Sequence, residues 1–333
     1  MSDMQNPYQN NAAEPETKPV IRFSRKNALW LFLIAAAGLI LAAFAAPGVT
    51  ALLPDAHTQV RELVINLMYY LPFCALPVYI SLRRKPDAVP SLRPGPIGLG
   101  AVLYVSVLAV LSVFLISDLT LLWCIPLQKL GFDVFKNALV LPAEPAMLVL
   151  CVFTSAAIPG VCEELVFRGV VLPGFENYGT RRAAMFSALL FALLHGSVTG
   201  LPGQFVLGLV LAQLVVSADS IYAGMIFHTV YNAAAILIEF LQRDIPAELS
   251  RPADIIAGIG GGEGVLWLVV ELLLIGWMLR FSLNVFFMRG RLRGVRLEPE
   301  RRQRLDRAEL ILLVAGLIMV ALLYASDVRY MLI

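Results

Sequence analysis

Three charged side chains lie inside one long apolar stretch of the sequence: Glu163, Glu164 and Arg168. On a helix, Glu164 and Arg168 stand at i, i+4 on one face, so they can form an ion pair. Glu163 is rotated by about 100° from Glu164 and has no such partner within its helix. We therefore expect Glu163 to be the carboxylate that is available for chemistry.

Two histidines follow in later apolar stretches. His195 closes one of them, four residues after Phe191, and His228 lies within another, with Asn232 at i+4 on the same face. At about 1.5 Å per residue, Glu163, His195 and His228 can all reach a common depth near mid-membrane. We expect them to share one cavity, which opens towards the cytoplasm or laterally to lipid near that side.

These residue types suit hydrolysis. A carboxylate whose pKa is tuned by its surroundings can take a proton from water, and a histidine can share or relay that proton. A second histidine and an amide can then stabilise a developing oxyanion. An alternative uses the same residues, because Glu163, His195 and His228 also form a ligand set for catalytic zinc. No His-Glu-x-x-His spacing supports it, so we expect either no cofactor or one divalent metal such as zinc.

The composition places these residues in a membrane. Of the 333 residues 59% are hydrophobic and 15% charged, with a mean hydropathy of +0.78, whereas soluble proteins average about 45–50% apolar and about 25% charged residues. Stretches near the length of a membrane span, about 20 residues, predict an all-α, polytopic transmembrane helix bundle of eight or nine spans. The nine candidates are 28–46, 63–82, 97–123, 146–172, 182–195, 203–218, 220–241, 264–283 and 309–325.

The basic residues alternate with these spans, as the positive-inside rule requires. Arg25 and Lys26 precede the first span, Arg181 and Arg182 follow the fourth, and an arginine-rich loop follows the eighth. We therefore expect the N-terminus in the cytoplasm. The expected location is the plasma membrane, the inner membrane of a bacterium, with the chain as an integral multi-pass protein.

The chain is divided by composition into four parts. Residues 1–26 are polar and predict a disordered cytoplasmic tail. Residues 27–143 hold N-terminal transmembrane helices, residues 144–241 the helical core with the candidate residues, and residues 242–333 the C-terminal transmembrane helices with the arginine-rich loop.

Three motifs in consecutive hydrophobic segments carry a family resemblance. They are Glu163-Glu164 with Arg168, Phe191 with His195, and His228 with Asn232. Glu-Glu-x-x-x-Arg, Phe-x-x-x-His and His-x-x-x-Asn in this order resemble the CPBP family of intramembrane proteases. That family is related to the type II CAAX prenyl endopeptidases and to the bacteriocin-processing and immunity proteins of the Abi group. The resemblance covers residues 144–241.

The resemblance implies roles for these residues. Glu163 would activate water with help from His195. His228 and Asn232 would stabilise the oxyanion, and Glu164, Arg168 and Phe191 would support the site. The family is described both as a metalloprotease family and as one with a metal-free glutamate mechanism, so the resemblance leaves the metal open.

Two functions of different classes follow. The first is an intramembrane endopeptidase that acts on a peptide or a membrane-protein segment, with the lipid bilayer as its surroundings and no nucleic acid as partner. The alternative is a non-catalytic membrane scaffold or transporter that retains the same helical core. Paired broken helices in two related halves, typical of many transporters, are not evident in the sequence, which favours the endopeptidase.

Overall fold

A computed structural model of the chain describes residues 23–54, 57–135, 141–142, 144–242, 255–292 and 304–332. Within these residues the regular structure is helical, and no β-strand is present. The helices are α1 (Arg25–Leu52), α2 (Thr58–Tyr69), α3 (Leu76–Arg84), α4 (Leu99–Lys129), α5 (Pro145–Val152), α6 (Ile158–Val166), α7 (Leu172–Phe175), α8 (Thr180–Leu194), α9 (Leu201–Ala218), α10 (Ile221–Gln242), α12 (Ile255–Gly258), α13 (Gly261–Leu292) and α14 (Arg307–Leu332). The prediction of an all-α bundle is confirmed.

All nine predicted spans coincide with helical segments. Seven segments of the described chain are long and apolar enough to cross a membrane; α2–α3 and α5–α7 each count as one of them. Helix α8, with 15 residues, is shorter than a usual span. Helix α13 has 32 residues and packs against α4 and α9. The chain is therefore an integral, multi-pass membrane protein.

Two of the spans contain π-helical turns next to the residues of interest. The turns are η1 (Tyr70–Ala75), η3 (Phe153–Ala157) and η4 (Phe167–Val171). A proline follows each turn by two residues: Pro77, Pro159 and Pro173. Proline has no N–H and its ring clashes with the carbonyl four residues earlier, and that carbonyl lies inside each turn. The wider π turn accommodates this clash while the span continues.

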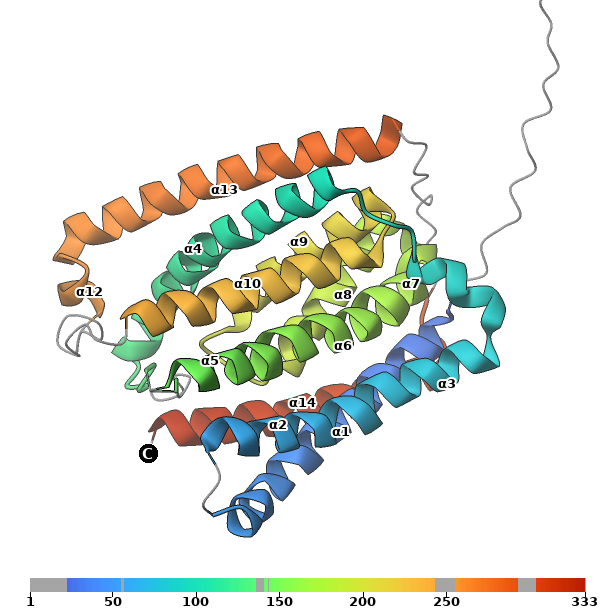
Figure 1. The fold of residues 1–333 in the computed structure, drawn as a ribbon, viewed down its shortest axis with the longest axis horizontal. Coiled ribbons are helices and arrows are strands. Elements are labelled where there is room, and N and C mark those ends of the chain that lie inside the picture. The colour runs from blue at the N-terminus through green and yellow to red at the C-terminus, as the bar shows by residue number, and fades with distance from the viewer. Residues whose placement is uncertain are drawn as a thin grey trace, which may run out of the picture.

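The helices run side by side, so the bundle has two ends (Figure 1). The N-terminal ends of α1, α4 and α10 meet the C-terminal ends of α3 and α9 at one of them. We call this the basic end, because it carries Arg25, Lys26, Arg83, Arg84, Lys85, Arg93, Arg181, Arg182, Arg304 and Arg307. The opposite end holds α12 and the C-terminus, and among the described residues its lysines and arginines are Arg61, Lys129 and Arg329.

Polar contacts confirm which segments meet at each end. At the basic end, Lys26 pairs with Asp306 at 3.1 Å, and Arg93 pairs with Glu176 at 2.5 Å. At the opposite end, the Asp133 N–H donates to the Met331 carbonyl at 3.0 Å. The predicted tail (residues 1–26) and arginine-rich loop lie largely outside the described residues. The four-part division of the chain stays a prediction.

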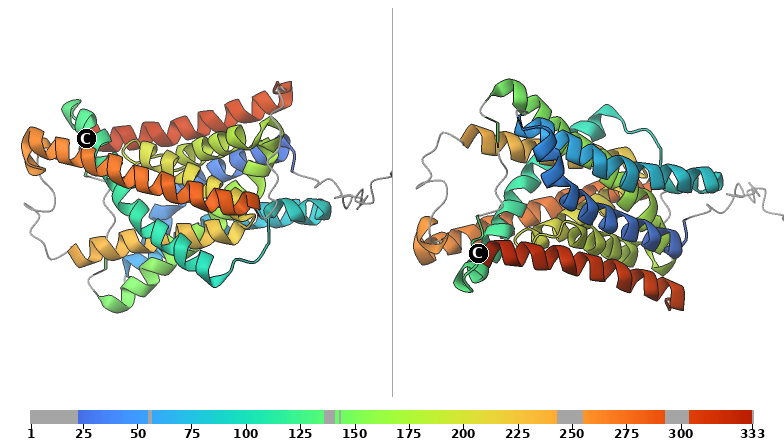
Figure 2. Two further views of the ribbon diagram at one scale, coloured as in Figure 1. Left: turned by 90° about the horizontal axis from the view of Figure 1, so that it is seen from above. Right: turned by 90° about the horizontal axis from the view of Figure 1, so that it is seen from below.

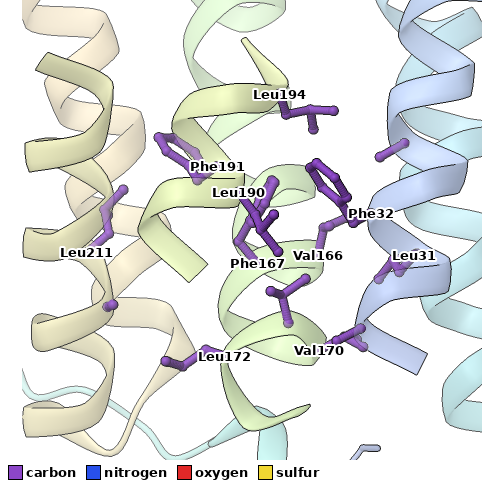
Figure 3. Packing of buried hydrophobic residues seen from close by; sticks show 14 of the residues in the cluster. Leu31, Phe32, Val166, Phe167, Val170, Leu172, Leu190, Phe191, Leu194 and Leu211 are labelled. Carbon is purple, nitrogen blue, oxygen red and sulfur yellow. The ribbon is translucent and has the colours of Figure 1, made fainter. Parts of the chain in front are cut away.

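The core of the bundle lies around α6, η4 and α8, and the outer helices face lipid. Figure 3 shows Phe167 and Leu190 packed between α1, with Phe32, and α9, with Leu211. Helix α13 lies at one edge of the bundle in Figure 1, and helix α14 lies at an edge in both views of Figure 2. Their outward side chains are large and apolar, as Trp267 at 72% exposure illustrates. Exposed apolar surface of this extent suits contact with acyl chains.

Candidate active site

A cavity of about 510 Å³ lies between α2, α4, α6, α9 and α10. Four residues predicted from the sequence line it together: Glu163, His195, His228 and Asn232. These four residues come from three helical segments, α6, the end of α8 and α10, and the fold brings them to one cavity. Glu164, Arg168 and Phe191 lie behind the cavity wall and are fully buried.

Glu163 stands at the centre of the cavity wall. Its Oε1 accepts a hydrogen bond of 2.7 Å from the Tyr70 hydroxyl. Its Oε2 is buried and has no hydrogen-bond partner among the described residues. The Nε2 atoms of His195 and His228 lie 3.8 Å and 4.0 Å from this oxygen. One carboxylate oxygen is therefore held, and the other faces two imidazole nitrogens across a gap.

The Nδ1 atom of each imidazole already has a hydrogen-bond partner. His195 Nδ1 lies 2.8 Å from the Phe191 carbonyl oxygen, which can only accept, so Nδ1 carries the proton. His228 Nδ1 lies 3.1 Å from Glu164 Oε1, and the same argument applies when that carboxylate is ionised. In the neutral tautomer, each histidine then presents an unprotonated Nε2 to the space in front of Glu163.

Glu164 and Arg168 form the predicted ion pair, with Arg168 Nη1 at 2.8 Å from Glu164 Oε1 and both side chains fully buried. Arg168 Nη2 also donates to the Gly208 carbonyl at 2.9 Å, which ties the pair to α9. The pairing prediction is confirmed. Because Glu164 Oε1 serves both Arg168 and His228, the pair fixes the orientation of a cavity residue.

The Phe191 ring packs against His195, its partner in the Phe-x-x-x-His motif, and against two further site residues. The ring lies 4.6 Å from the Arg168 guanidinium carbon, a cation–π distance. The same ring meets His195 edge-on at 4.6 Å and His228 at 5.7 Å between centroids. One aromatic side chain therefore separates the buried cation from both imidazoles and packs against all three.

Two glycines allow the helices to approach closely enough for these contacts. A Cβ on Gly224 would lie 2.6 Å from Glu164 Oε2, and a Cβ on Gly160 would lie 2.4 Å from Thr229 Oγ1. Both distances are shorter than real Cβ contacts. Helix α10 can carry His228 to Glu164 because these positions have no side chain.

The three predicted metal ligands are spread more widely than a zinc site. Ligands about 2.0–2.1 Å from a tetrahedral zinc ion lie about 3.4 Å from one another. The separations from Glu163 Oε2 to the two imidazole nitrogens are 3.8 Å and 4.0 Å. No group of three His, Cys, Asp or Glu in the described parts of the chain is arranged to hold a metal ion. The arrangement does not fit a zinc ion, and the mechanism below uses none.

The polar lining of the cavity beyond Glu163 lies towards the end opposite the basic end. Its further lining residues include Asn66, Thr120, Ser155 and Gln204. Each lies between Glu163 and the opposite end, as the course of α2, α4, α5 and α9 shows (Figure 1). Counting residues along a span gave the depth of Glu163, but it gave no information on which end the packing closes. The expected opening on the cytoplasmic side, or laterally to lipid near that side, stays a prediction.

The residue that the sequence analysis missed is Tyr70. It lies at the start of the π-helical turn η1, in a span where the sequence analysis named no candidate residue. Its contact with Glu163 joins residues 93 positions apart. The one local signal was the pair of prolines at 72 and 77, which marks an irregular turn in an apolar span.

The fold and the site together define a multi-pass membrane protein with a buried, polar, carboxylate-centred cavity. Residues 145–234 match the family model described as "Type II CAAX prenyl endopeptidase Rce1-like". This match confirms the resemblance drawn from the three motifs, and the family supports an intramembrane endopeptidase as the general activity. No curated protein and no solved structure matches the chain.

Proposed function

We propose that the chain is an intramembrane endopeptidase in which Glu163 activates the water that attacks a peptide bond. The observation that carries this proposal is the position of Glu163 Oε2. It is buried, unpartnered among the described residues, and faces two imidazole nitrogens at 3.8 Å and 4.0 Å on the wall of the cavity. A water molecule between Glu163 Oε2 and His195 Nε2 would donate to both acceptors and be ready to lose a proton.

The first step is the attack on the carbonyl carbon. Glu163 takes a proton from the water as the oxygen forms its bond to carbon, and His195 Nε2 orients the same water. The Tyr70 hydroxyl holds the other oxygen of Glu163 at 2.7 Å. The carboxylate therefore keeps one orientation, with Oε2 towards the water, while its proton occupancy changes.

The developing oxyanion needs hydrogen-bond donors. We assign this role to His228 and Asn232, which stand at i, i+4 on α10 and both line the cavity. His228 can donate from Nε2 only while that nitrogen carries a proton, with Nδ1 directed at Glu164 Oε1, and the side-chain amide of Asn232 supplies N–H donors of its own. The proton held by Glu163 then passes to the leaving nitrogen as the carbon–nitrogen bond breaks. The products are one carboxylate and one amine, and Glu163 returns to its starting state.

The proposed substrate is a peptide or a segment of a membrane protein. The cavity wall offers polar groups and apolar surface together, as a polypeptide requires. The family name refers to prenylated CAAX substrates, and the geometry described above requires a peptide bond but no prenyl group. We further propose a cytoplasmic N-terminus, because the basic end carries most of the described lysines and arginines.

A comparison of membrane peptidomes tests the proposal. Cells that produce the native chain should contain cleavage products that are missing from cells with Glu163→Gln. The matched control is Glu144→Gln, the same chemical change at an exposed position outside the cavity, and it should keep the products. The two variants must be equally abundant in the membrane.

Identical peptidomes from the native chain and from Glu163→Gln would favour the scaffold or transporter alternative. A loss of products in both Glu163→Gln and Glu144→Gln would point to general damage from the substitution instead. Neither result is expected, because Gln keeps the shape of Glu163 and its ability to accept from Tyr70.

A further inference from the structure

We propose that the substrate reaches Glu163 from the extracytoplasmic face of the membrane, as a polypeptide segment exposed on that side. This inference rests on the proposed function and adds the side of entry and the class of substrate. It depends on three observations: a closed basic end, a polar path from the opposite end, and the distribution of basic residues.

The basic end is closed by packing. Residues 166–176, which lead from the site to this end, are all buried. Arg93 caps them, with ion pairs to Glu176 at 2.5 Å and to Asp219 at 3.3 Å. The Arg93 carbonyl also accepts from the Ile221 N–H at 2.9 Å. Glu164 and Arg168 fill the space directly behind Glu163, so the described residues leave water no polar route from this side.

The opposite end offers such a route. Asn66 lies in the second half of α2, one turn before Tyr70, Ser155 lies in η3, and Gln204 lies near the start of α9. All three are partly exposed and line the cavity. Gln204 Oε1 is buried without a hydrogen-bond partner among the described residues. It is an acceptor that can receive a backbone N–H from an extended chain. A polypeptide is therefore a suitable occupant of this path.

The basic residues assign the two ends to the two sides of the membrane. Lysine and arginine are retained in cytoplasmic loops, and the closed end is the one that carries the ten basic residues named above, against three at the opposite end among the described residues. The open end then faces away from the cytoplasm. A C-terminal motif on a cytoplasmic protein would not reach Glu163, whereas an extracytoplasmic loop or tail of a membrane protein would.

Thiol labelling with a membrane-impermeant maleimide tests the side of entry. Ser155→Cys places a near-isosteric thiol on the cavity wall, and Ser220→Cys is the matched change at a buried position of the basic end. Gln242→Cys and Arg181→Cys mark the exposed surface of each end. Labelling is measured above that of the parent chain, in intact spheroplasts and in sealed inside-out vesicles.

In spheroplasts we expect labelling of Ser155→Cys and Gln242→Cys, and none of Ser220→Cys or Arg181→Cys. In inside-out vesicles Arg181→Cys alone should react. Labelling of Ser155→Cys only in inside-out vesicles, or in neither preparation, would overturn the proposal. Thr120→Cys, on another wall of the cavity, replaces Ser155→Cys if that variant unfolds at a lower temperature than the parent.

Labelling of the cavity and cleavage of a peptide are two independent measurements. Adding Glu163→Gln to Ser155→Cys should leave labelling unchanged, because entry of the reagent needs no turnover. A fluorescence-quenched peptide library of random sequence should be cleaved by spheroplasts and not by inside-out vesicles. Cleavage by inside-out vesicles alone would contradict extracytoplasmic entry. If no Glu163-dependent cleavage occurs in either, the proposed function fails, and the labelling still decides the side of entry.

Discussion

Two neighbouring glutamates of α6 occupy opposite kinds of environment. Glu164 is fully buried, paired with Arg168, and bonded to His228. Glu163, one residue earlier, lines the cavity and keeps one oxygen without a partner in the described chain. A buried charge is stable only when its partners are complete, and a catalytic carboxylate needs an oxygen that is not already occupied. One helical turn therefore provides both Glu164, which pairs with Arg168 and orients His228, and Glu163, the reactive carboxylate.

Removal of Arg168, the cation that pairs with Glu164, should have the largest effect on stability. Arg168→Ala leaves Glu164 buried without its partner, and breaking such a pair costs about 3–5 kcal/mol. We expect a lower unfolding temperature in detergent and a lower abundance in the membrane. Arg84→Ala, the same change at an exposed position, should leave both unchanged. An unfolding temperature of Arg168→Ala equal to that of the native chain would contradict a stabilising role of the pair.

Overpacking at Gly224, next to Glu164, should have a smaller effect on stability. Gly224→Ala places a methyl group 2.6 Å from Glu164 Oε2 and 2.7 Å from Val215, and overpacking of this kind costs about 1–3 kcal/mol. Gly48→Ala is the control, because nothing lies within 4 Å of its added Cβ in α1. It should be neutral or stabilising by about 0.5–1 kcal/mol. The measurement is thermal unfolding of both variants; equal shifts in the same direction would show that the gap at Gly224 has no role.

Removal of the hydrogen bond from Tyr70 to Glu163 should affect turnover more than stability. Tyr70→Phe removes the donor to Glu163 Oε1 but keeps the ring. We expect turnover to fall by about tenfold or more, because Glu163 Oε2 is no longer held towards the water. Loss of a hydrogen bond to a charged group costs about 1.5–3 kcal/mol, so the unfolding temperature should fall less than in Arg168→Ala. Tyr79→Phe, on an exposed tyrosine of α3, should turn over at the native rate. If Tyr70→Phe does so as well, the hydroxyl does not position Glu163.

Removal of divalent metal should have the smallest effect. The separations of 3.8 Å and 4.0 Å around Glu163 Oε2 are wider than a tetrahedral zinc site. Turnover should therefore survive prolonged incubation with EDTA or 1,10-phenanthroline. A loss that added zinc restores, together with zinc found in the purified protein by elemental analysis, would show that a metal occupies the site.

The contrast also separates what the sequence could predict from what it could not. The pair of Glu164 and Arg168 was predictable because i, i+4 neighbours meet on any helix. The helical bundle followed from the length of the apolar stretches. The contact between Tyr70 and Glu163 was not predictable, because it depends on how two distant spans pack. The close packing of residues 166–176 at the basic end was not predictable for the same reason, because it is a tertiary feature.

The most direct test compares Glu163→Gln with Glu164→Gln in the purified protein, on any peptide that the native chain cleaves. Glu163→Gln should lose turnover while its unfolding temperature stays at the native value. Glu164→Gln should lower the unfolding temperature, because it removes the charge that Arg168 and His228 share. Native turnover by Glu163→Gln would contradict the assignment of Glu163 as the group that activates water.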